Sequence, residues 1–205
     1  MAEARPGPGE ELVGGGEPSV PRQAATVILL RGGAESLEVL LAKRNPAQRF
    51  MGGAWVFPGG AVDADEDHRL AGVREVAEEV GITLPDPGAL VPFARWITPE
   101  EVRIRFDTHF FLAAVPAGTE ATADGNETVD LGWFTPEGAL EARARDEITL
   151  VFPTMKTLEQ LAPFPSAGAL LDWARGRTVE PIRPRVITEG ETARIVLPGE
   201  PGYEP

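Results

Sequence analysis

Glu75, Glu78 and Glu79 stand close together in the sequence. On a helix, side chains three and four residues apart lie on the same face, so the three carboxylates would form one acidic cluster. Like charges at these spacings repel each other by about 0.2–0.5 kcal/mol per pair. A hard divalent cation removes this repulsion, because carboxylate oxygens are the ligands that Mg²⁺ and Mn²⁺ prefer. The spacing therefore indicates a metal site, and a solvated acidic face of a surface helix is the alternative.

The residues around this cluster favour the metal site. Residues 58–60, Pro-Gly-Gly, precede the expected helix, and glycine lets the backbone approach a bound group closely. Arg74 is four residues before Glu78 and can pair with the cluster. We expect the helix to run from about residue 67 to residue 80 and to stop at Gly81, where a residue that accepts positive φ is favoured. Its opposing apolar stripe would consist of Val73, Val76, Ala77 and Val80.

This segment resembles the signature of one enzyme family. Residues 60–82 match the Nudix box at every specified position, namely Gly60, Glu66, Arg74, Glu75, Val76, Glu78, Glu79, Gly81 and Ile82. The resemblance implies the Nudix fold, an α/β (α+β) architecture in which an α/β/α sandwich holds a mixed central β-sheet. It also implies a hydrolase that cleaves a nucleoside diphosphate linked to another group, with Mg²⁺ or Mn²⁺ as cofactor.

The resemblance further implies which residues hold the metal. Glu75 and Glu79 correspond to the principal metal-binding glutamates of the box, and Glu78 corresponds to a third one that members use variably. The carbonyl of Gly59 corresponds to a frequent backbone ligand. These four residues are the candidate metal ligands.

Catalytic roles are implied for residues inside and beyond the box. Arg74 and Glu66 correspond to a pair that orients the glutamates, and such partners fix the geometry of metal ligands. Hydrolysis also needs a base that activates water. Glu127, six residues before Trp133, lies where several members carry a loop glutamate that approaches the metals. The alternative for Glu127 is an exposed loop acid, in which case Glu78 would be the base.

The segment before the box resembles the motif of coenzyme A diphosphatases. It carries Leu40, Leu41, Arg44, Arg49, Gly53, the run 57–60 and Asp63, and it departs from the motif at Ala42, Asn45 and Trp55. Guanidinium groups suit phosphate oxygens, so Arg44 and Arg49 are the candidate substrate-binding residues. The resemblance implies coenzyme A or an acyl-CoA as substrate, cleaved to 3′,5′-ADP and (acyl-)4′-phosphopantetheine. ADP-ribose and other ADP-sugars stay open, because Pro92 and Pro99 fall where that subfamily carries a proline.

The elements around the box predict a mixed sheet with helices on both faces. Strands are expected at residues 24–31, 37–44, 55–57, 90–96, 105–114 and 128–134. Thr135 and Pro136 predict the start of one helix, and Ser166 predicts the cap of another that runs to Arg175. Residues 185–188 and 193–197 flank a Glu-Gly-Glu turn as hairpin strands would. Interleaved strands and helices are typical of this layered architecture.

Length and composition limit the domain organisation. The 205 residues suffice for one domain, and glycine and proline are concentrated near both ends. We expect a disordered lead-in over residues 1–22, a Nudix hydrolase domain over residues 23–177, and a Pro/Gly-rich extension over residues 178–205, for which a docked hairpin is one option.

Charge and cysteine content limit the partners. A net charge of −13, from 19 Lys and Arg against 32 Asp and Glu, repels polyanions and argues against nucleic acid as a partner. Without cysteine, carboxylates are the main chemical resource. No apolar run reaches the roughly 18 residues of a membrane span, so we expect no membrane partner and a cytoplasmic location. The expected partner is a small nucleotide-type substrate, with a homodimer as an option from the family. A non-catalytic nucleotide-sensing domain is disfavoured, because the whole box is present.

Overall fold

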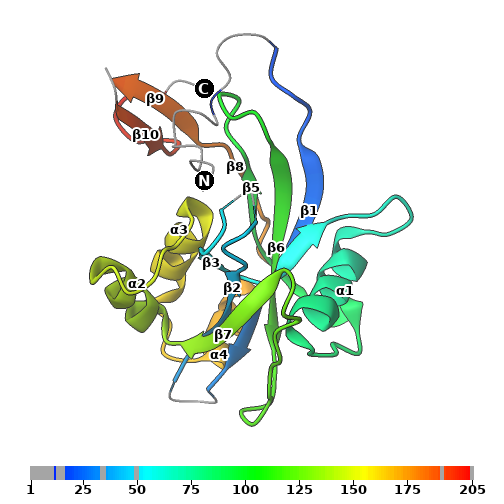
Figure 1. The fold of residues 1–205 in the computed structure, drawn as a ribbon. Coiled ribbons are helices and arrows are strands. Elements are labelled where there is room, and N and C mark those ends of the chain that lie inside the picture. The colour runs from blue at the N-terminus through cyan, green and yellow to red at the C-terminus, as the bar shows by residue number, and fades with distance from the viewer. Residues whose placement is uncertain (1–11, 13–16, 33–35, 49–50, 190–191, 204–205) are drawn as a thin grey trace.

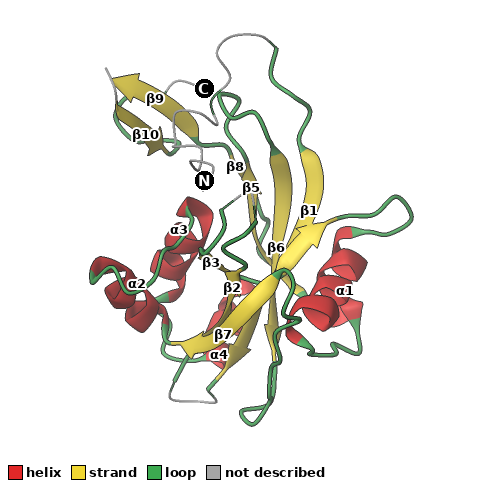
Figure 2. Cartoon of the chain, in the orientation of Figure 1, coloured by secondary structure: helices red, strands yellow, loops and turns green. Residues whose placement is uncertain are grey.

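A mixed β-sheet lies at the centre of the molecule, with helices on either side (Figures 1 and 2). The computed structural model describes residues 12, 17–32, 36–48, 51–189 and 192–203. The strands are β1 Arg22–Arg31, β2 Glu38–Arg44, β3 Trp55–Val56, β4 Gly59–Ala61, β5 Val91–Ile97, β6 Phe106–Ala114, β7 Thr128–Phe134, β8 Pro181–Ile182, β9 Arg185–Glu189 and β10 Thr192–Val196. The helices are α1 His68–Val80, α2 Pro136–Ala144, α3 Phe152–Leu161 and α4 Ala167–Ala174, with a 3-10 turn at Pro87–Ala89.

The sheet combines parallel and antiparallel pairs, as the sequence predicted. Its strands follow the order β3-β2-β1-β6-β5-β8, while β4 pairs with β1 and β7 pairs with β2. β1 runs parallel to β6, from Arg22 opposite Phe106 to Leu30 opposite Ala114, and β5 runs parallel to β8. The six expected strands are confirmed, each within two residues of its predicted bounds. The short strands β4 and β8 were not predicted.

The two faces of the sheet carry separate apolar clusters. Val27 and Leu29 of β1 pack in a cluster with Ala71, Val76 and Val80 of α1. Ile28 and Leu30 point to the other face, because successive side chains alternate along a strand. They pack in the second cluster, which includes Ala139 of α2, Leu158 of α3 and Leu170 of α4. Helices on both faces are therefore confirmed.

Helix α1 begins and ends where its capping residues predict. The carboxylate of Asp67 accepts hydrogen bonds from the backbone N–H groups of Arg69 and Leu70, both at 2.9 Å. Gly81 takes a left-handed conformation with φ 68° and its N–H donates to Ala77, which ends the helix. The predicted N-terminal and C-terminal bounds are therefore confirmed.

The predicted apolar stripe of α1 is partly wrong. Ala77 is exposed, whereas Glu79 is buried. The helix contacts β1 closely at Gly72, where an added Cβ would meet Val27 Cγ2 at 2.8 Å. Residues seven positions apart share a face of a helix, so this contact turns Glu79 toward the sheet.

Described segments near both ends pack on the rest of the chain. Of the expected lead-in, Leu12 forms a β-bridge with Val102, and the carbonyl of Ser19 accepts a hydrogen bond from Arg105 Nη1 at 2.6 Å; residues 1–11 and 13–16 lie outside the described residues. Strands β9 and β10 pair antiparallel in register, and β9 is held to residue Glu101 by Arg185 Nε at 2.7 Å. None of the helices in the described ranges has the length and apolarity that crossing a membrane requires.

Candidate active site

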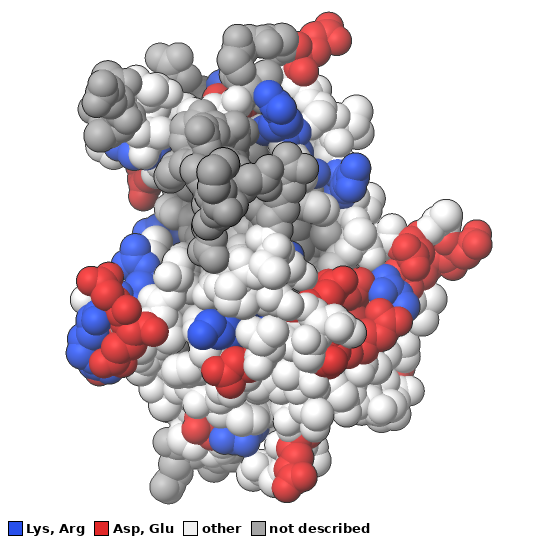
Figure 3. Space-filling model, in the orientation of Figure 1, with Lys and Arg blue, Asp and Glu red and all other residues white. Residues whose placement is uncertain are grey.

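The side chain of Arg74 lies at the centre of the acidic cluster on α1. Its Nε and Nη2 donate to the two carboxylate oxygens of Glu66, at 3.2 and 2.6 Å. Its Nη1 donates to Glu75 at 2.8 Å and to Glu78 at 3.0 Å, and Nη2 also donates to the carbonyl of Ala61 at 3.0 Å. The hydrogen bond with Glu66 lowers the pKa of that carboxyl and raises the pKa of Arg74. Figure 3 shows the resulting surface, where red acidic side chains gather over α1 and the loop before it, with blue basic atoms among them.

Glu75 lies against the backbone of β4. A Cβ added to Gly60 would clash with the carboxylate of Glu75, so glycine at residue 60 leaves room for the carboxylate in its present position. Burial raises the pKa of Glu75 in spite of the hydrogen bond from Arg74, and the negative charges of Glu78 and Glu127 raise it further. The carboxylate is therefore held in a place where its charge is unfavourable even with Arg74 beside it, and a further cation would favour the charged form.

Glu79 is the most buried carboxylate of the cluster, with 7 % of its surface exposed. Its Oε2 accepts a hydrogen bond from the N–H of Gly59 at 2.9 Å. Burial raises the pKa of Glu79 to about 7, against this hydrogen bond and the positive charge of Arg44, while the charge of Glu75 adds to the rise. The sequence predicted the carbonyl of Gly59 as a ligand, and the structure shows its N–H orienting Glu79.

The loop before β7 brings Glu127 toward the cluster. The negative charge of Glu127 raises the pKa of both Glu75 and Glu79. The Glu127 carbonyl accepts a hydrogen bond from the backbone of Asn45 at 2.8 Å, which joins the loop to the end of β2. The carboxylate of Asp124 accepts from the backbone N–H groups of Asn126, Glu127 and Thr128, at 3.2, 3.0 and 2.7 Å.

Arg44 ends β2 next to this loop. Its positive charge lowers the pKa of Glu79, so the guanidinium lies within electrostatic reach of the cluster. The structure therefore brings Arg44 together with six charged residues that were predicted from the box and the loop. These residues are Glu66, Arg74, Glu75, Glu78, Glu79 and Glu127. Arg49, the second predicted substrate-binding arginine, lies outside the described residues.

Sequence reasoning missed one residue that positions the site, Asp124, and one contact that does so, that of Gly60 with Glu75. Asp124, in the run Asp-Gly-Asn, organises the Glu127 loop, and such Asx residues typically accept hydrogen bonds from the backbone that follows them. That signal was available in the sequence. The contact of Gly60 with Glu75 was not, because it depends on the pairing of β4 with β1.

The donor set fits a hard divalent cation in its chemistry. It offers carboxylates, two of them with pKa values raised by burial, and positive charge would remove that cost. Within the described part of the chain, no group of three or more Asp, Glu or His side chains is arranged so that it could hold a metal ion. Arg74 instead neutralises Glu75 and Glu78.

Known proteins resemble this chain in sequence and in fold. The NUDIX domain family matches residues 20–154. The CTP pyrophosphohydrolase of Escherichia coli is 35 % identical over 104 residues, which are 51 % of this chain and 71 % of that enzyme. An acyl-coenzyme A diphosphatase of Xenopus laevis is 30 % identical over 101 residues, 47 % of this chain but only 27 % of the frog protein. The crystal structure of a NUDIX hydrolase from Alicyclobacillus acidocaldarius superposes with a TM-score of 0.69 and 25 % identity, covering 75 % of this chain and 96 % of the other. The predicted fold is thereby confirmed.

Proposed function

This chain belongs to the NUDIX family of diphosphatases, and from that premise we propose a substrate for it. We propose that the substrate is coenzyme A or an acyl-CoA, which is cleaved to 3′,5′-ADP and (acyl-)4′-phosphopantetheine. The observation that carries this proposal is the position of Arg44 within electrostatic reach of Glu79. Arginine suits phosphate oxygens, and coenzyme A has a 3′-phosphate in addition to its diphosphate. The partial likeness to an acyl-coenzyme A diphosphatase supports the same substrate class.

We propose that Glu75 and Glu79 hold Mg²⁺ or Mn²⁺, with Glu78 and the carbonyl of Gly59 as further ligands. NUDIX enzymes typically depend on divalent metals, and the carboxylate donor set suits such ions. A bound cation would neutralise phosphate oxygens and make water more acidic.

The chain's own residues would bind and orient the reacting groups. Arg74, held by both oxygens of Glu66, keeps Glu75 in place against β4. Arg44 would bind a substrate phosphate. Glu127, on a loop tied to β2, would accept the proton of the attacking water at its carboxylate. Glu78, whose side chain pairs with Arg74 and is 61 % exposed, is the rival base.

A substrate panel tests the proposal. Coenzyme A, octanoyl-CoA, ADP-ribose, CTP and NADH are incubated with the protein and Mg²⁺ or Mn²⁺, and the products are identified by mass spectrometry. We expect the highest kcat/KM for the two CoA compounds and 3′,5′-ADP as their product. A higher kcat/KM for ADP-ribose or CTP would overturn the substrate assignment and leave the family assignment intact.

The role of Arg44 has a separate test. Arg44→Gln is expected to raise KM about tenfold or more for coenzyme A, because a charge-assisted hydrogen bond contributes about 1.5–3 kcal/mol, and to raise KM less for dephospho-CoA. Lys43→Gln, one residue earlier on β2, is the matched control. Equal effects of Arg44→Gln on the two substrates would reject recognition of the 3′-phosphate.

A further inference from the structure

The end of the loop before β7 connects two parts of the candidate site. On one side the loop is bound to the end of α1, because the backbone N–H of Asp124 donates to the carbonyl of Glu79 at 3.2 Å. On the other side it is bound to Asn45, which directly follows Arg44 at the end of β2. The loop therefore lies between the carboxylates of α1 and the arginine that is proposed to bind a substrate phosphate.

A bulge in β7 determines which residue of the loop lies opposite Asn45. β7 runs along β2 (Figure 1), and their pairing shifts by one residue between Lys43 and Arg44. Bulges of this kind change the direction of nearby side chains and are frequent next to active sites. Beyond the shift, Arg44 lies opposite Thr128, and the N–H of Asn45 donates to the carbonyl of Glu127 at 2.8 Å. Without the shift, Asn45 would lie opposite Thr128 instead of Glu127.

Asn45 forms hydrogen bonds with this loop and with its own turn. Its backbone N–H and its side-chain Nδ2 donate to the carbonyls of Glu127 and Asn126, both at 2.8 Å. Its side-chain Oδ1 and its backbone carbonyl accept from the N–H groups of Ala47 and Gln48, both at 2.9 Å. An Asn side chain that accepts from the backbone two positions later stabilises a turn. Asn45 therefore joins the turn after β2 to the loop before β7.

We propose that Asn45 is a positioning residue for Glu127, which it holds through the backbone of the loop. The inference rests on the proposed function, because that function makes Glu127 the base that accepts a proton from water. Asn45 is one of the departures from the coenzyme A diphosphatase motif, and its amide supplies both the donor and the acceptor that the two side-chain contacts need. Because Asn45 directly follows Arg44, it also fixes the base relative to the arginine that would bind a substrate phosphate.

Two variants of Asn45 test this role in the full chain with coenzyme A and Mg²⁺. Asn45→Asp keeps the shape of the side chain and the acceptor for Ala47 but loses the donor, and Asn45→Ala loses both groups. Each should lower kcat about tenfold or more, because a misplaced reacting group slows the chemical step, and Asn45→Asp should leave KM nearly unchanged. Asn126→Ala is the matched control, since the carbonyl that accepts from Asn45 belongs to the backbone. A normal kcat in Asn45→Asp would overturn the inference.

A double-mutant cycle shows whether Asn45 acts through Glu127. In the Glu127→Gln background the base is already lost, so the addition of Asn45→Asp should lower kcat by no more than about twofold. A residue that only stabilises the fold would lower kcat by the same factor in both backgrounds. An equal loss of about tenfold with and without Glu127→Gln would therefore refute the positioning role.

Hydrogen exchange without substrate or metal separates this inference from the proposed function. Asn45→Asp should make the backbone amides of residues 125–128 exchange about fivefold faster, as for loss of one hydrogen bond, while exchange in α1 stays slow. Faster exchange in a protein that does not hydrolyse coenzyme A would support the hold of Asn45 on the loop and refute the proposed function. Unchanged exchange in a protein that hydrolyses coenzyme A would refute the role of Asn45 alone.

Discussion

At the scale of single residues, Arg74 explains how carboxylates with repelling spacings share one helix. It forms ion pairs with Glu66, Glu75 and Glu78 at 2.6, 2.8 and 3.0 Å. Because the bidentate contact with Glu66 fixes the guanidinium, Arg74 holds Glu75 in a defined orientation. Glu79 lacks such an ion pair among the described contacts and lies buried instead.

Glu75→Gln should lower metal-dependent turnover by about 100-fold or more. Mutation of a residue that only supports a metal ligand typically lowers activity about 10–100-fold, and Glu75 is itself a proposed ligand. The amide keeps the shape of the side chain, so we expect the fold to remain intact by circular dichroism. Glu137→Gln, at an exposed acid of α2, is the control. Normal turnover in Glu75→Gln would contradict the metal-site assignment.

Glu79 should make the metal-free protein less stable as the pH rises. Its folded pKa of about 7 lies above the ordinary value of 4.5, so between these values the folded state holds a proton that the unfolded state has released. The free energy of unfolding therefore falls through this window, by about 3 kcal/mol from this residue. Chemical denaturation in EDTA at about pH 5 and about pH 8 measures the fall, and Glu79→Gln should reduce it. Identical pH profiles of the two proteins would contradict the raised pKa.

The sequence predicted the members of the site better than their environments. Helical spacing alone places Glu75, Glu78 and Glu79 near one another. It does not show that Glu79 is buried, because the side of α1 that faces the sheet depends on the close contact at Gly72. The approach of Glu127 was predicted from the family pattern and depends on hydrogen bonds between distant segments.

At the scale of elements, helices with capping side chains were predictable and helices without them were not. Thr135 and Ser166 accept hydrogen bonds from Gly138 and Ala169, and they cap α2 and α4 as predicted. Helix α3 was missed, because Val151 at its N-terminus makes no side-chain cap. Strand β4 was missed because its Gly-Gly sequence is typical of a turn, and it exists only through its pairing with β1.

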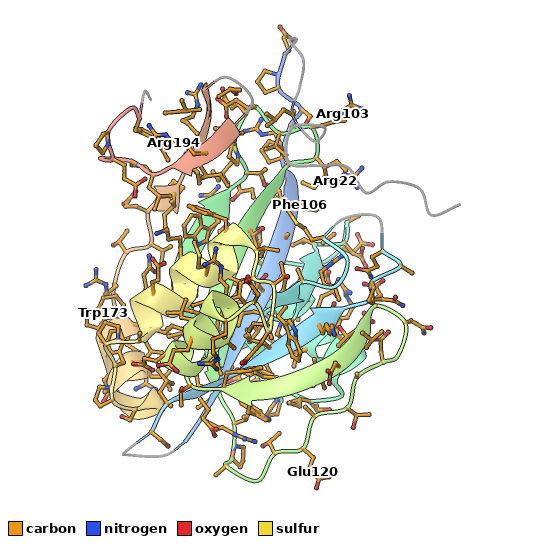
Figure 4. The ribbon with its side chains drawn as sticks, turned by 60° about the vertical axis from the view of Figure 1, so that its left-hand side comes forward. Arg22, Arg103, Phe106, Glu120, Trp173 and Arg194 are labelled. Carbon is orange, nitrogen blue, oxygen red and sulfur yellow. The ribbon has the colours of Figure 1, made fainter. Side chains whose placement is uncertain are left out.

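The loop that carries Glu127 should control the turnover number. Glu127→Gln is expected to lower kcat by about 100-fold or more, the usual contribution of a general base, with little change in KM. Asp124→Ala should lower kcat by about tenfold, because it removes the three backbone hydrogen bonds that shape the loop. Glu120→Ala, at the exposed position labelled in Figure 4, is the control in the same connection. A normal rate for Glu127→Gln would transfer the role of base to Glu78.

At the scale of the whole molecule, contacts between distant segments escape sequence patterns. The net charge of −13 includes the acidic cluster, whose carboxylates the structure draws together around Arg74. Arg105 is buried and donates to the carbonyl of Ser19, so a described part of the N-terminal region packs on the loop before β6. The high glycine and proline content near the ends predicted no such contact, because composition does not specify a partner.

The β9–β10 hairpin is attached to the rest of the molecule through Glu101. Removing the Glu101 carboxylate should therefore loosen the hairpin. Glu101 accepts hydrogen bonds from Arg185 Nε at 2.7 Å and from the backbone N–H of Val186 at 3.2 Å. Burial raises the pKa of Glu101, but these hydrogen bonds outweigh burial and hold the pKa below 4.5. The hydrogen bonds therefore stabilise the fold above pH 4.5, and this stabilisation is lost as the pH falls through the folded pKa.

Glu101→Ala should therefore lower the free energy of unfolding by about 1 kcal/mol at neutral pH, since both partners are about 30 % exposed and solvent weakens the pair. Hydrogen exchange of residues 185–196 should become faster, while exchange of β1 and β6 stays slow, because the hairpin opens locally before the sheet does. Glu159→Ala, which breaks the surface pair with Lys156, is the control. Unchanged exchange in the hairpin would show that contacts other than those of Glu101 hold it.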